Sequence, residues 1–516
     1  MEIHGTVFVP PRAGCRHPWR TILLRNAGRF DGVCNSLYTI CFSITGTRPL
    51  SLFCAVPQFM NKTFDKQYHI WTIGCQMNEA DSRKLGAQLE TLGYGPTPDP
   101  DEADVVVLNT CVVRQQAENK IYGRLGSLKT IKQRRPDLVL GLMGCLVGVK
   151  EAPALQEKFP FVDVFMSPSD GGPLLDYLQE NDLYEAVLLQ EQSARSLRDA
   201  IQDAENVLPI DQRGVAVTAH VPVVLGCSHA CTFCIIPYRR GGERSRPSAD
   251  VLHEIELLAG QGIREVMLLG QIVDRYGLDL DEDINLGDLL ARANKIDGIH
   301  RIRFLTSHPN WMTDKLLDAV SELDKVCPHL EVPVQAGNDE VLANMRRGYT
   351  SDDYYRLVDR IRDRLPQAAL NTDIIVGFPG ETDEQFMDTY RMMQRVQFDK
   401  VHISTYSPRP KTVAVRKMPD NVTMAEKKRR RQMLDDLQKE VLTAKNARYQ
   451  NTVVEVLVEK HQKGRWFGRT PDNRLVYFEG GEDLVGQLVP VQIDWVGPYS
   501  LIGQKRQHAN AEVLAV

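Results

Sequence analysis

Short apolar segments alternate with helix-length amphipathic segments through two long stretches of the chain. Uninterrupted apolar runs such as Val105–Leu108 are typical of strands that are buried on both faces of a parallel sheet. The first stretch therefore predicts a parallel α/β domain over residues 65–190, followed by a charged linker at 191–216. Its expected strands are His69–Ile73, Val105–Leu108, Leu138–Met143 and Val162–Met166.

The alternation resumes at residue 217 and predicts a second domain that extends to residue 443. Six strand–helix units indicate a (β/α)6 partial barrel, in which functional residues lie in the loops that follow the strands. The expected strands are Val221–Leu225, Glu265–Leu269, Arg301–Thr306, His329–Val334, Leu370–Val376 and Lys400–Tyr406.

The last segment changes to short strands of alternating hydrophobicity, joined by turns that contain glycine. This pattern predicts a small β-barrel over residues 444–508. Aromatic and basic residues interleave along its strands, and such surfaces stack unpaired bases and follow phosphates, although an aromatic core with scattered charges is the alternative. These residues are Trp466, Phe467, Arg469, Arg474, Tyr477, Lys505 and Arg506.

Residues 1–64 differ from the rest, because they are rich in arginine and cysteine and poor in acidic residues. An arginine-rich, acid-poor start is typical of a transit peptide, but Pro10, Pro11 and Pro18 interrupt any helical period. We expect an atypical extension that is disordered or that precedes a true start at Met60.

Charge and hydropathy indicate whether the chain can bind nucleic acid or a membrane. The net charge of −5 confines any nucleic-acid surface to a local patch. The basic run Lys427–Arg431 begins a predicted helix, and it is either a solvated face or a contact to nucleic-acid phosphates. No apolar run reaches the roughly 18 residues that a membrane span requires, so no membrane association is expected.

One group of three cysteines, Cys227, Cys231 and Cys234, forms a CxxxCxxC motif and is called the CxxxCxxC trio below. Soft thiolates at this spacing select iron–sulfur, zinc or copper(I), and a 4Fe–4S cluster held by three thiolates keeps one iron open for a ligand. Structural zinc would need a fourth ligand. His229 lies between two of the cysteines and cannot easily reach the same metal.

A second group, Cys75, Cys111 and Cys145, is called the strand-end trio because each cysteine directly follows a predicted strand. Neighbouring parallel strands bring their carboxyl ends to one edge, where ligands bind. A second three-thiolate site is therefore expected, although three separate buried thiols would also fit. Clustered cysteines in a chain of this size indicate metal ligands and a reducing cytoplasm rather than disulfides.

The CxxxCxxC motif resembles that of the radical SAM superfamily, whose members cleave S-adenosylmethionine (SAM). The segments Gly74–Asn78, Asn109–Cys111 and Gly144–Cys145 resemble the N-terminal domain of the methylthiotransferases, and the tail resembles their tRNA-binding TRAM domain. In this order the three regions are similar to the MiaB branch of that family. The resemblance implies two 4Fe–4S clusters as cofactors. The cluster on the CxxxCxxC trio would bind SAM, and the auxiliary cluster on the strand-end trio would carry sulfur.

The resemblance also implies a function, with the CxxxCxxC trio as catalytic residues. A 5′-deoxyadenosyl radical would enable methylthiolation of C2 of N6-isopentenyladenosine at position 37 in the tRNA anticodon loop. A reduced flavodoxin- or ferredoxin-type electron donor, a monomeric state and a cytoplasmic location are expected. Alternatives are methylthiolation of threonylcarbamoyl-adenosine in tRNA or of a ribosomal-protein aspartate, a two-cluster electron carrier, and a zinc-dependent RNA-binding protein.

Loops after the predicted barrel strands supply candidate SAM contacts. The resemblance places the methionine moiety near Gly270 and Gln271, after the second strand. Ser307, Gln335 and Gly377 follow the third, fourth and fifth strands. Polar groups there could hold the ribose, and glycine lets the backbone approach the adenine closely.

One segment after the second strand departs from the family pattern. Where the family usually has Asn-Val-Asn, this chain has Ile272, Val273 and Asp274. The side-chain contacts to SAM that the family makes at these positions are therefore not expected from residues 272 and 274.

Overall fold

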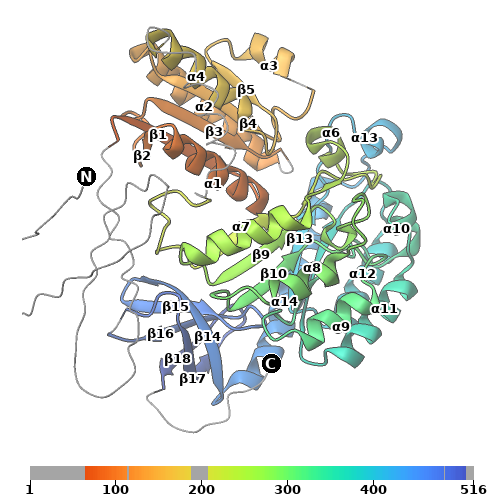
Figure 1. Cartoon of the computed structure of the whole chain (residues 1–516). Helices are drawn as coiled ribbons and strands as arrows, with labels where there is room; N and C mark the ends of the chain where they lie inside the picture. The colour runs from red at the N-terminus through yellow and green to blue at the C-terminus, as the bar shows by residue number, and fades with distance from the viewer. Residues whose placement is uncertain (1–63, 113–114, 151, 187–206, 482, 507–516) are drawn as a thin grey trace, which may run out of the picture. The chain divides into compact units, whose positions relative to one another are not determined.

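The computed structural model describes residues 64–112, 115–150, 152–186, 207–481 and 483–506 (Figure 1). All of these belong to one compact unit that spans residues 63–516. Nearly all of the predicted N-terminal extension and much of the predicted linker lie outside the described residues. Three assemblies follow one another along the chain: a parallel sheet with helices, a larger array of parallel strands and helices, and a closed barrel.

The first assembly is a parallel five-stranded sheet in the order β2-β1-β3-β4-β5. One buried cluster includes Ile121 and Leu125 of α2, and another includes Leu85 and Leu89 of α1. The strand β2, which contains Gly95 and Pro96, was not predicted, because it is too short to show a hydrophobic period. The elements are β1 (Lys66–Ile73), α1 (Gln76–Thr91), β2 (Tyr94–Pro96), β3 (Val105–Thr110), α2 (Gln115–Arg134), β4 (Val139–Gly144), α3 (Ala152–Lys158), β5 (Val164–Met166) and α4 (Gly172–Ala186).

The second assembly contains six principal strands in two parallel sheets, β6-β9-β10 and β11-β12-β13. A parallel bridge from Ile302 to Val326 and a hydrogen bond from the Ser307 N–H to the Glu331 carbonyl (3.0 Å) join the two sheets. The strands are β6 (Thr218–Pro222), β9 (Glu265–Leu269), β10 (Arg301–Leu305), β11 (His329–Glu331), β12 (Ala369–Val376) and β13 (Lys400–Thr405), with a short hairpin of β7 (Val224–Leu225) and β8 (Arg244–Ser245) after β6.

Helices that lie between or after these strands cover one face of each sheet, and most of them contribute to a single large core. They are α6 (Ile236–Arg240), α7 (Ser248–Gly260), α8 (Leu286–Ala293), α9 (Asp314–Glu322), α10 (Asp339–Met345), α11 (Ser351–Arg364), α12 (Asp383–Val396), α13 (Val413–Lys417) and α14 (Met424–Asn446). On the other face, Met77 of α1 packs against Leu269 and Leu305. The first assembly therefore contributes an apolar side chain to the inner face of the second.

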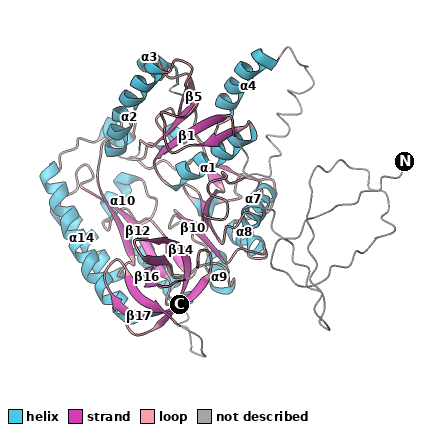
Figure 2. Cartoon of the chain, turned by 90° about the vertical axis from the view of Figure 1, so that its left-hand side faces the viewer, coloured by secondary structure: helices cyan, strands magenta, loops and turns pink. Residues whose placement is uncertain are grey.

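The third assembly is a closed barrel in the order β14-β15-β16-β18-β17, and α14, which precedes it, packs against β13 and α12 (Figure 2). Trp466 and Phe478 lie in its core. The strands are β14 (Val453–Gln462), β15 (Arg465–Arg469), β16 (Leu475–Glu479), β17 (Leu488–Val496) and β18 (Leu501–Lys505). The predicted fold class, a parallel α/β domain, a β/α partial barrel and a small β-barrel, is confirmed.

Buried arginines of β10 join the second assembly to the closed barrel. Arg303 is fully buried, pairs with Glu265 at 3.0 Å, and donates to the carbonyls of Thr470 and Pro471 at 2.9 and 2.7 Å. Its neighbour Arg301 pairs with Glu455 of β14 at 3.0 Å. A buried cation is stable only when its donors are satisfied in this way. The closed barrel is thus fastened to the second assembly by ion pairs and hydrogen bonds.

Replacing Arg303 with methionine tests this attachment. Glu265 would keep its buried charge without a partner, so we expect a loss of about 3–5 kcal/mol of stability, measured as the free energy of urea unfolding. The exposed pair of Arg360 with Asp314 provides the control, since Arg360→Met should change stability little. Similar losses in the two variants would contradict the argument.

Candidate active site

The strand-end trio lies at one edge of the first sheet. Ile73 is paired in register with Thr110, and Thr110 with Gly144, so Cys75, Cys111 and Cys145 all leave this edge within two residues of one another. Charge interactions between the thiols of Cys75 and Cys145 indicate that they are close in space. The fold therefore brings together three cysteines that are far apart in sequence.

Two glycines make this convergence possible. A Cβ on Gly74 would lie 2.6 Å from the side chain of Asn78, and a Cβ on Gly144 would lie 2.5 Å from the carbonyl oxygen of Thr110. Gly144 also has a φ of +97°, in the region that favours glycine. No other residue fits directly before Cys75 or Cys145 without moving the neighbouring loop.

A pair of buried asparagines connects the loops that carry the strand-end trio. Asn78 donates to the Asn109 side chain at 2.7 Å and to the Thr110 carbonyl at 2.9 Å, and Asn109 donates back to the Asn78 carbonyl at 2.9 Å. The Cys75 thiol donates to Asn78 Oδ1 at 3.4 Å. Both amides are fully buried, so these bonds fix the relative positions of the first two loops.

The CxxxCxxC trio occupies the loop between β7 and α6. Gly226 begins this loop with a φ of +70°, and a Cβ there would lie 2.1 Å from the Gly242 carbonyl oxygen. The Cys227 N–H donates to the Gly241 carbonyl at 3.1 Å, and the Thr232 hydroxyl donates to the Asn344 carbonyl at 2.8 Å. The loop is therefore held on one side by Gly241, which follows α6, and on the other side by the end of α10.

Three arginines of the second assembly interact with thiols of the two trios. Arg347 donates to Cys231 Sγ at 3.2 Å, and the positive charge of Arg240 lowers the pKa of the Cys145 thiol against the effect of burial. Arg409 carries a charge that acts on Cys111 and pairs with Glu118 at 3.2 Å. All three guanidinium groups are buried. Each trio is thus accompanied by fixed positive charge, which favours the thiolate forms that bind metals.

Burial acts on the thiols in the opposite direction. It raises the pKa of Cys234 to about 12 and also raises the pKa values of Cys227 and Cys145, with nearby arginines partly opposing this effect. Without a metal these thiols are protonated at neutral pH, so iron binding must release protons.

Among the described residues, no three His, Cys, Asp or Glu side chains converge on a point where a single metal ion could bind them all. A cubane cluster does not require such a point, because each thiolate binds a different iron. The donor set of each trio, three soft thiolates at the mouth of a loop, fits an iron–sulfur cluster.

Unpartnered polar atoms surround the CxxxCxxC trio. The hydroxyl of Ser307 and Nε2 of His308 are buried without a hydrogen-bond partner, and the His308 ring stacks edge-on against His229 at 4.7 Å. Burial and the charge of Arg347 lower the pKa of His308 to about 2, so this imidazole is neutral. Buried polar groups normally have partners, and these atoms fit a polar ligand such as SAM.

Of the other predicted SAM contacts, Gly270 and Gly377 directly follow β9 and β12, whereas Gln335 lies four residues after the end of β11. Gly270 is buried, with Gln271 beside it, and a Cβ on Gly270 would lie 2.8 Å from Val273 Cα. Gln335 is buried with a φ of +76°. The Gly377 N–H donates to Glu381 at 2.5 Å. The roles of these residues in SAM binding stay predictions.

The segment that departs from the family pattern has a clear structural role. Ile272 is buried and packs with Cys227 and Ile236, which places an aliphatic wall next to the CxxxCxxC trio. Asp274 accepts from the His308 N–H at 3.0 Å, and burial raises its pKa to about 8. This carboxyl is therefore mostly protonated at neutral pH.

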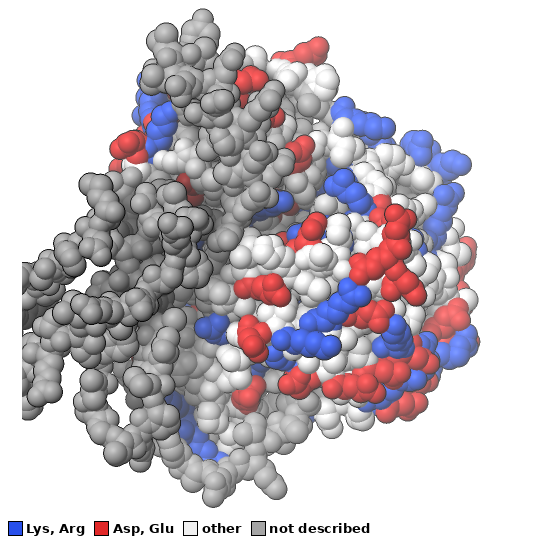
Figure 3. Space-filling model, in the orientation of Figure 1, with Lys and Arg blue, Asp and Glu red and all other residues white. Residues whose placement is uncertain are grey.

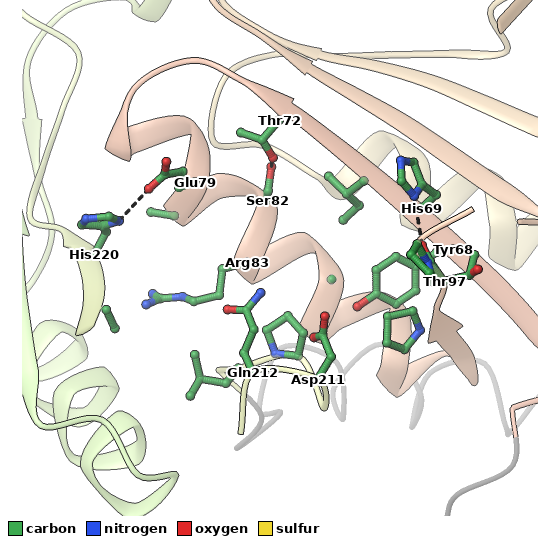
Figure 4. A pocket seen from close by; sticks show the side chains of 18 of the residues that line it. Tyr68, His69, Thr72, Glu79, Ser82, Arg83, Thr97, Asp211, Gln212 and His220 are labelled. Atoms are coloured by element: carbon green, nitrogen blue, oxygen red, sulfur yellow. Dashed lines mark hydrogen bonds and ion pairs between the residues drawn. The ribbon is translucent and has the colours of Figure 1, made fainter. Parts of the chain in front are cut away.

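A cavity of about 610 Å³ lies between α1, β1 and the start of β6, away from the cysteines (Figure 4). His220 lies 3.2 Å from Glu79 there, and the hydroxyls of Thr72 and Ser82 are 2.7 Å apart. No cysteine is among the described residues that line it. This cavity is therefore separate from the two trios, where the soft metal-binding donors lie.

Sequence reasoning missed the three arginines. Arg240 stands six residues after Cys234, where its proximity to the motif was a usable signal. Arg347 and Arg409 are distant in sequence from the cysteines they accompany, and only the fold reveals them.

Replacing Gly144 with alanine tests the geometry of the strand-end trio. The added Cβ would push the Thr110 carbonyl and the Cys145 loop apart, so the variant should bind fewer irons than the roughly four of one intact cluster. The measurement is iron per chain after anaerobic reconstitution, with all three cysteines of the CxxxCxxC trio replaced by alanine. Gly126→Ala in α2 is the control, because nothing lies within 4 Å of its Cβ, and full iron loss there would contradict the argument.

Comparison with known families gives three matches along the chain. Residues 67–167 match the family described as "Uncharacterized protein family UPF0004", residues 221–393 match the radical SAM superfamily, and residues 447–505 match the TRAM domain. No helix among the described residues is long and apolar enough to span a membrane. Among solved structures, the radical SAM methyltransferase TsrM from Kitasatospora setae is similar with a TM-score of 0.47 and 16% identity, over 68% of this chain and 77% of that chain.

Curated relatives are similar over most of their length. The tRNA-2-methylthio-N(6)-dimethylallyladenosine synthase of Chloroflexus aurantiacus is 44% identical, over 85% of this chain and 91% of the relative. The synthase of the same name from Dehalococcoides mccartyi is also 44% identical, over 84% and 97%, and that of Thermoanaerobacter pseudethanolicus is 41% identical, over 86% and 93%. With the two cysteine trios in place, the chain belongs to the family of radical SAM tRNA-2-methylthio-N(6)-dimethylallyladenosine synthases.

Proposed function

We propose that the protein catalyses SAM-dependent methylthiolation of C2 of N6-isopentenyladenosine at position 37 of tRNA. The observation that carries the proposal is the presence of two three-cysteine sites in one compact unit, accompanied by buried arginines, in a chain 44% identical to curated synthases of this kind. An aromatic C2–H bond is too inert for acid–base chemistry, so a cofactor must supply the reactive species. Family membership implies SAM and 4Fe–4S clusters as these cofactors.

The CxxxCxxC trio would hold the cluster that binds SAM, and the strand-end trio would hold the auxiliary cluster. When bound, these groups supply a 5′-deoxyadenosyl radical and the methylthio group. Ser307 and His308 would offer buried polar atoms to SAM, while Arg347 donates to Cys231 Sγ. Gly270, Gln271, Gln335 and Gly377 are proposed to complete the SAM site.

Apolar side chains near both trios would keep water out. Met77, Leu269 and Leu305 form a buried group on the inner face of the second assembly, and Ile272 covers Cys227. A radical intermediate must be protected from side reactions, and a dry site provides that protection. The chain itself thus contributes exclusion of water and placement of the two trios.

The surface near the CxxxCxxC trio supports a tRNA substrate. The Ala414 N–H of α13 donates to the Thr232 carbonyl at 2.8 Å, so α13 lies beside the CxxxCxxC loop. Arg416 and Lys417 of this helix are exposed. Figure 3 shows basic side chains gathered at the upper right, where Figure 1 has α13, whereas acidic and basic side chains are mixed over the helices below. Phosphates approaching the trio would meet this basic patch.

The basic run at the start of α14 contributes less to RNA binding than its sequence suggested. Lys427 pairs with Asp420, Arg430 with Glu381, and the two exposed arginines pair with acidic neighbours. Most of its charge is therefore neutralised within the chain.

The closed barrel offers a smaller RNA surface than the sequence pattern implied. Trp466 is in the core, and Arg474 is buried against Asp399 and Asp472. Phe467 and Tyr477 remain half-buried, with ring centroids 5.8 Å apart, and are the better candidates for stacking on a base.

We further infer a cytoplasmic location, because the substrate is tRNA, and a reduced flavodoxin- or ferredoxin-type protein as electron donor. The chain is proposed to act as a monomer. The proposed domain limits are residues 65–190, 217–443 and 444–508, and the family matches at 67–167, 221–393 and 447–505 fall within them.

Nucleoside mass spectrometry tests the proposed function. The reconstituted protein, SAM and a reductant should convert N6-isopentenyladenosine in tRNA to its 2-methylthio derivative. Transfer RNA with unmodified adenosine or threonylcarbamoyl-adenosine at position 37 provides the matched controls. Absence of a methylthio product with about eight irons bound would overturn the proposal. Product from threonylcarbamoyl-adenosine alone would show that this nucleoside is the substrate instead.

Single cysteine variants test the proposed division between the trios. Cys231→Ala should abolish formation of 5′-deoxyadenosine, whereas Cys111→Ala should leave SAM cleavage intact and stop methylthiolation. Both products are measured in the same reaction by mass spectrometry. Cys327→Ala is the control, because this buried thiol belongs to neither trio. Loss of only SAM cleavage in both trio variants would contradict the division.

A further inference from the structure

Arg240 connects the two cysteine sites. It is the last residue of α6, the helix that begins directly after the CxxxCxxC loop, yet its side chain is only 3% exposed and points into the first assembly. It lies 3.4 Å from Asp81, 3.3 Å from Asn78 Oδ1 and 3.3 Å from Ser169 Oγ, and its positive charge lowers the pKa of the Cys145 thiol against the effect of burial.

These partners are the groups that position the strand-end trio. Asn78 accepts from the Cys75 thiol and joins the first two loops, and Cys145 is itself a member of the trio. Asp81 is held in turn by the Ser169 hydroxyl at 2.7 Å. One guanidinium therefore contacts the groups that position one trio, while its backbone belongs to the helix that follows the other trio.

The charge of this group matters as much as its contacts. The acidic side chain that pairs with Arg240 is Asp81, which is also almost fully buried. When the thiols of Cys75 and Cys145 become thiolates, their negative charges add to that of Asp81. A buried guanidinium is the group that compensates them, and such neighbours set the reduction potential of an iron–sulfur cluster.

We propose that Arg240 is a positioning residue that sets the placement of the strand-end trio relative to the CxxxCxxC trio and raises the reduction potential of the auxiliary cluster. The proposal rests on the proposed function for its catalytic consequence. Its electrostatic part requires only that the strand-end trio binds a cluster.

The electrostatic part is tested in chains that lack the CxxxCxxC cysteines, so that only the auxiliary cluster forms. Its reduction potential is measured by electron paramagnetic resonance at a series of poised potentials. Arg240→Gln should lower the potential, because a nearby positive charge favours the added electron. Arg240→Lys should restore most of the wild-type value. Asp81→Asn should raise the potential, because it removes a negative charge. If Arg240→Gln does not fold, the potential of Asp81→Asn tests whether buried charge near the strand-end trio sets the potential of the auxiliary cluster.

Arg83 provides a matched control. It also joins α1 to the second assembly through a buried ion pair, but its partner at 2.6 Å is Glu254 of α7, which belongs to neither trio. Arg83→Gln should leave the potential unchanged. An unchanged potential in Arg240→Gln, or an equal shift in Arg83→Gln, would overturn the proposal, as would shifts of the same sign in Arg240→Gln and Asp81→Asn.

The positional part is tested in the full chain with isopentenylated tRNA. Arg240→Gln should form more 5′-deoxyadenosine per methylthiolated nucleoside than wild type, because SAM cleavage no longer meets a correctly placed sulfur donor. An unchanged ratio would overturn this part. If wild type itself makes no methylthio product, the proposed function fails, while the reduction potentials still judge the role of Arg240.

Discussion

The docking of α1 on the second assembly is the constraint on which both cysteine sites depend. It includes contact with the edge strand β6, the packing of Met77 against Leu269 and Leu305, and a series of polar contacts along the helix. Arg83 pairs with Glu254, and Glu90 accepts from the Ile210 N–H at 2.7 Å and pairs with Arg213 at 3.1 Å. Since α1 begins directly after Cys75, this contact fixes the strand-end trio against the second assembly.

Buried charge is the second theme of the structure. Arginines lie beside Cys145, Cys231 and Cys111, and others join the closed barrel to β10. Burying a cation is costly unless carboxylates, carbonyls or thiolates surround it. At the cysteines the cost of burying an arginine is linked to function, because the neighbouring thiols carry full negative charge only when they bind a cluster. Assembly of the clusters and docking of the domains are therefore expected to stabilise each other.

Hydrophobic periodicity predicted most of the secondary structure. The strand Glu265–Leu269 has the bounds that were expected, and the strands that begin at Arg301 and Lys400 end one residue earlier than expected. Misses occurred where local patterns are too short, as at β2, or where a single expected strand divides, as at β6 and β7. Arg474 was predicted to bind RNA but is buried at the interface with the second assembly. The prediction failed because an alternating pattern does not show which part of the protein covers a strand face.

The sequence by itself determined the fold class, the two trios and the glycines that precede Cys75 and Cys145, since each follows from local spacing and from the geometry of parallel strands. The tertiary structure alone decided which charged groups accompany the thiols. Arg347 meets Cys231 and Arg240 meets Cys145 across long sequence separations. Such contacts depend on how helices and sheets dock, and docking depends on the sum of many weak interactions that no short segment encodes.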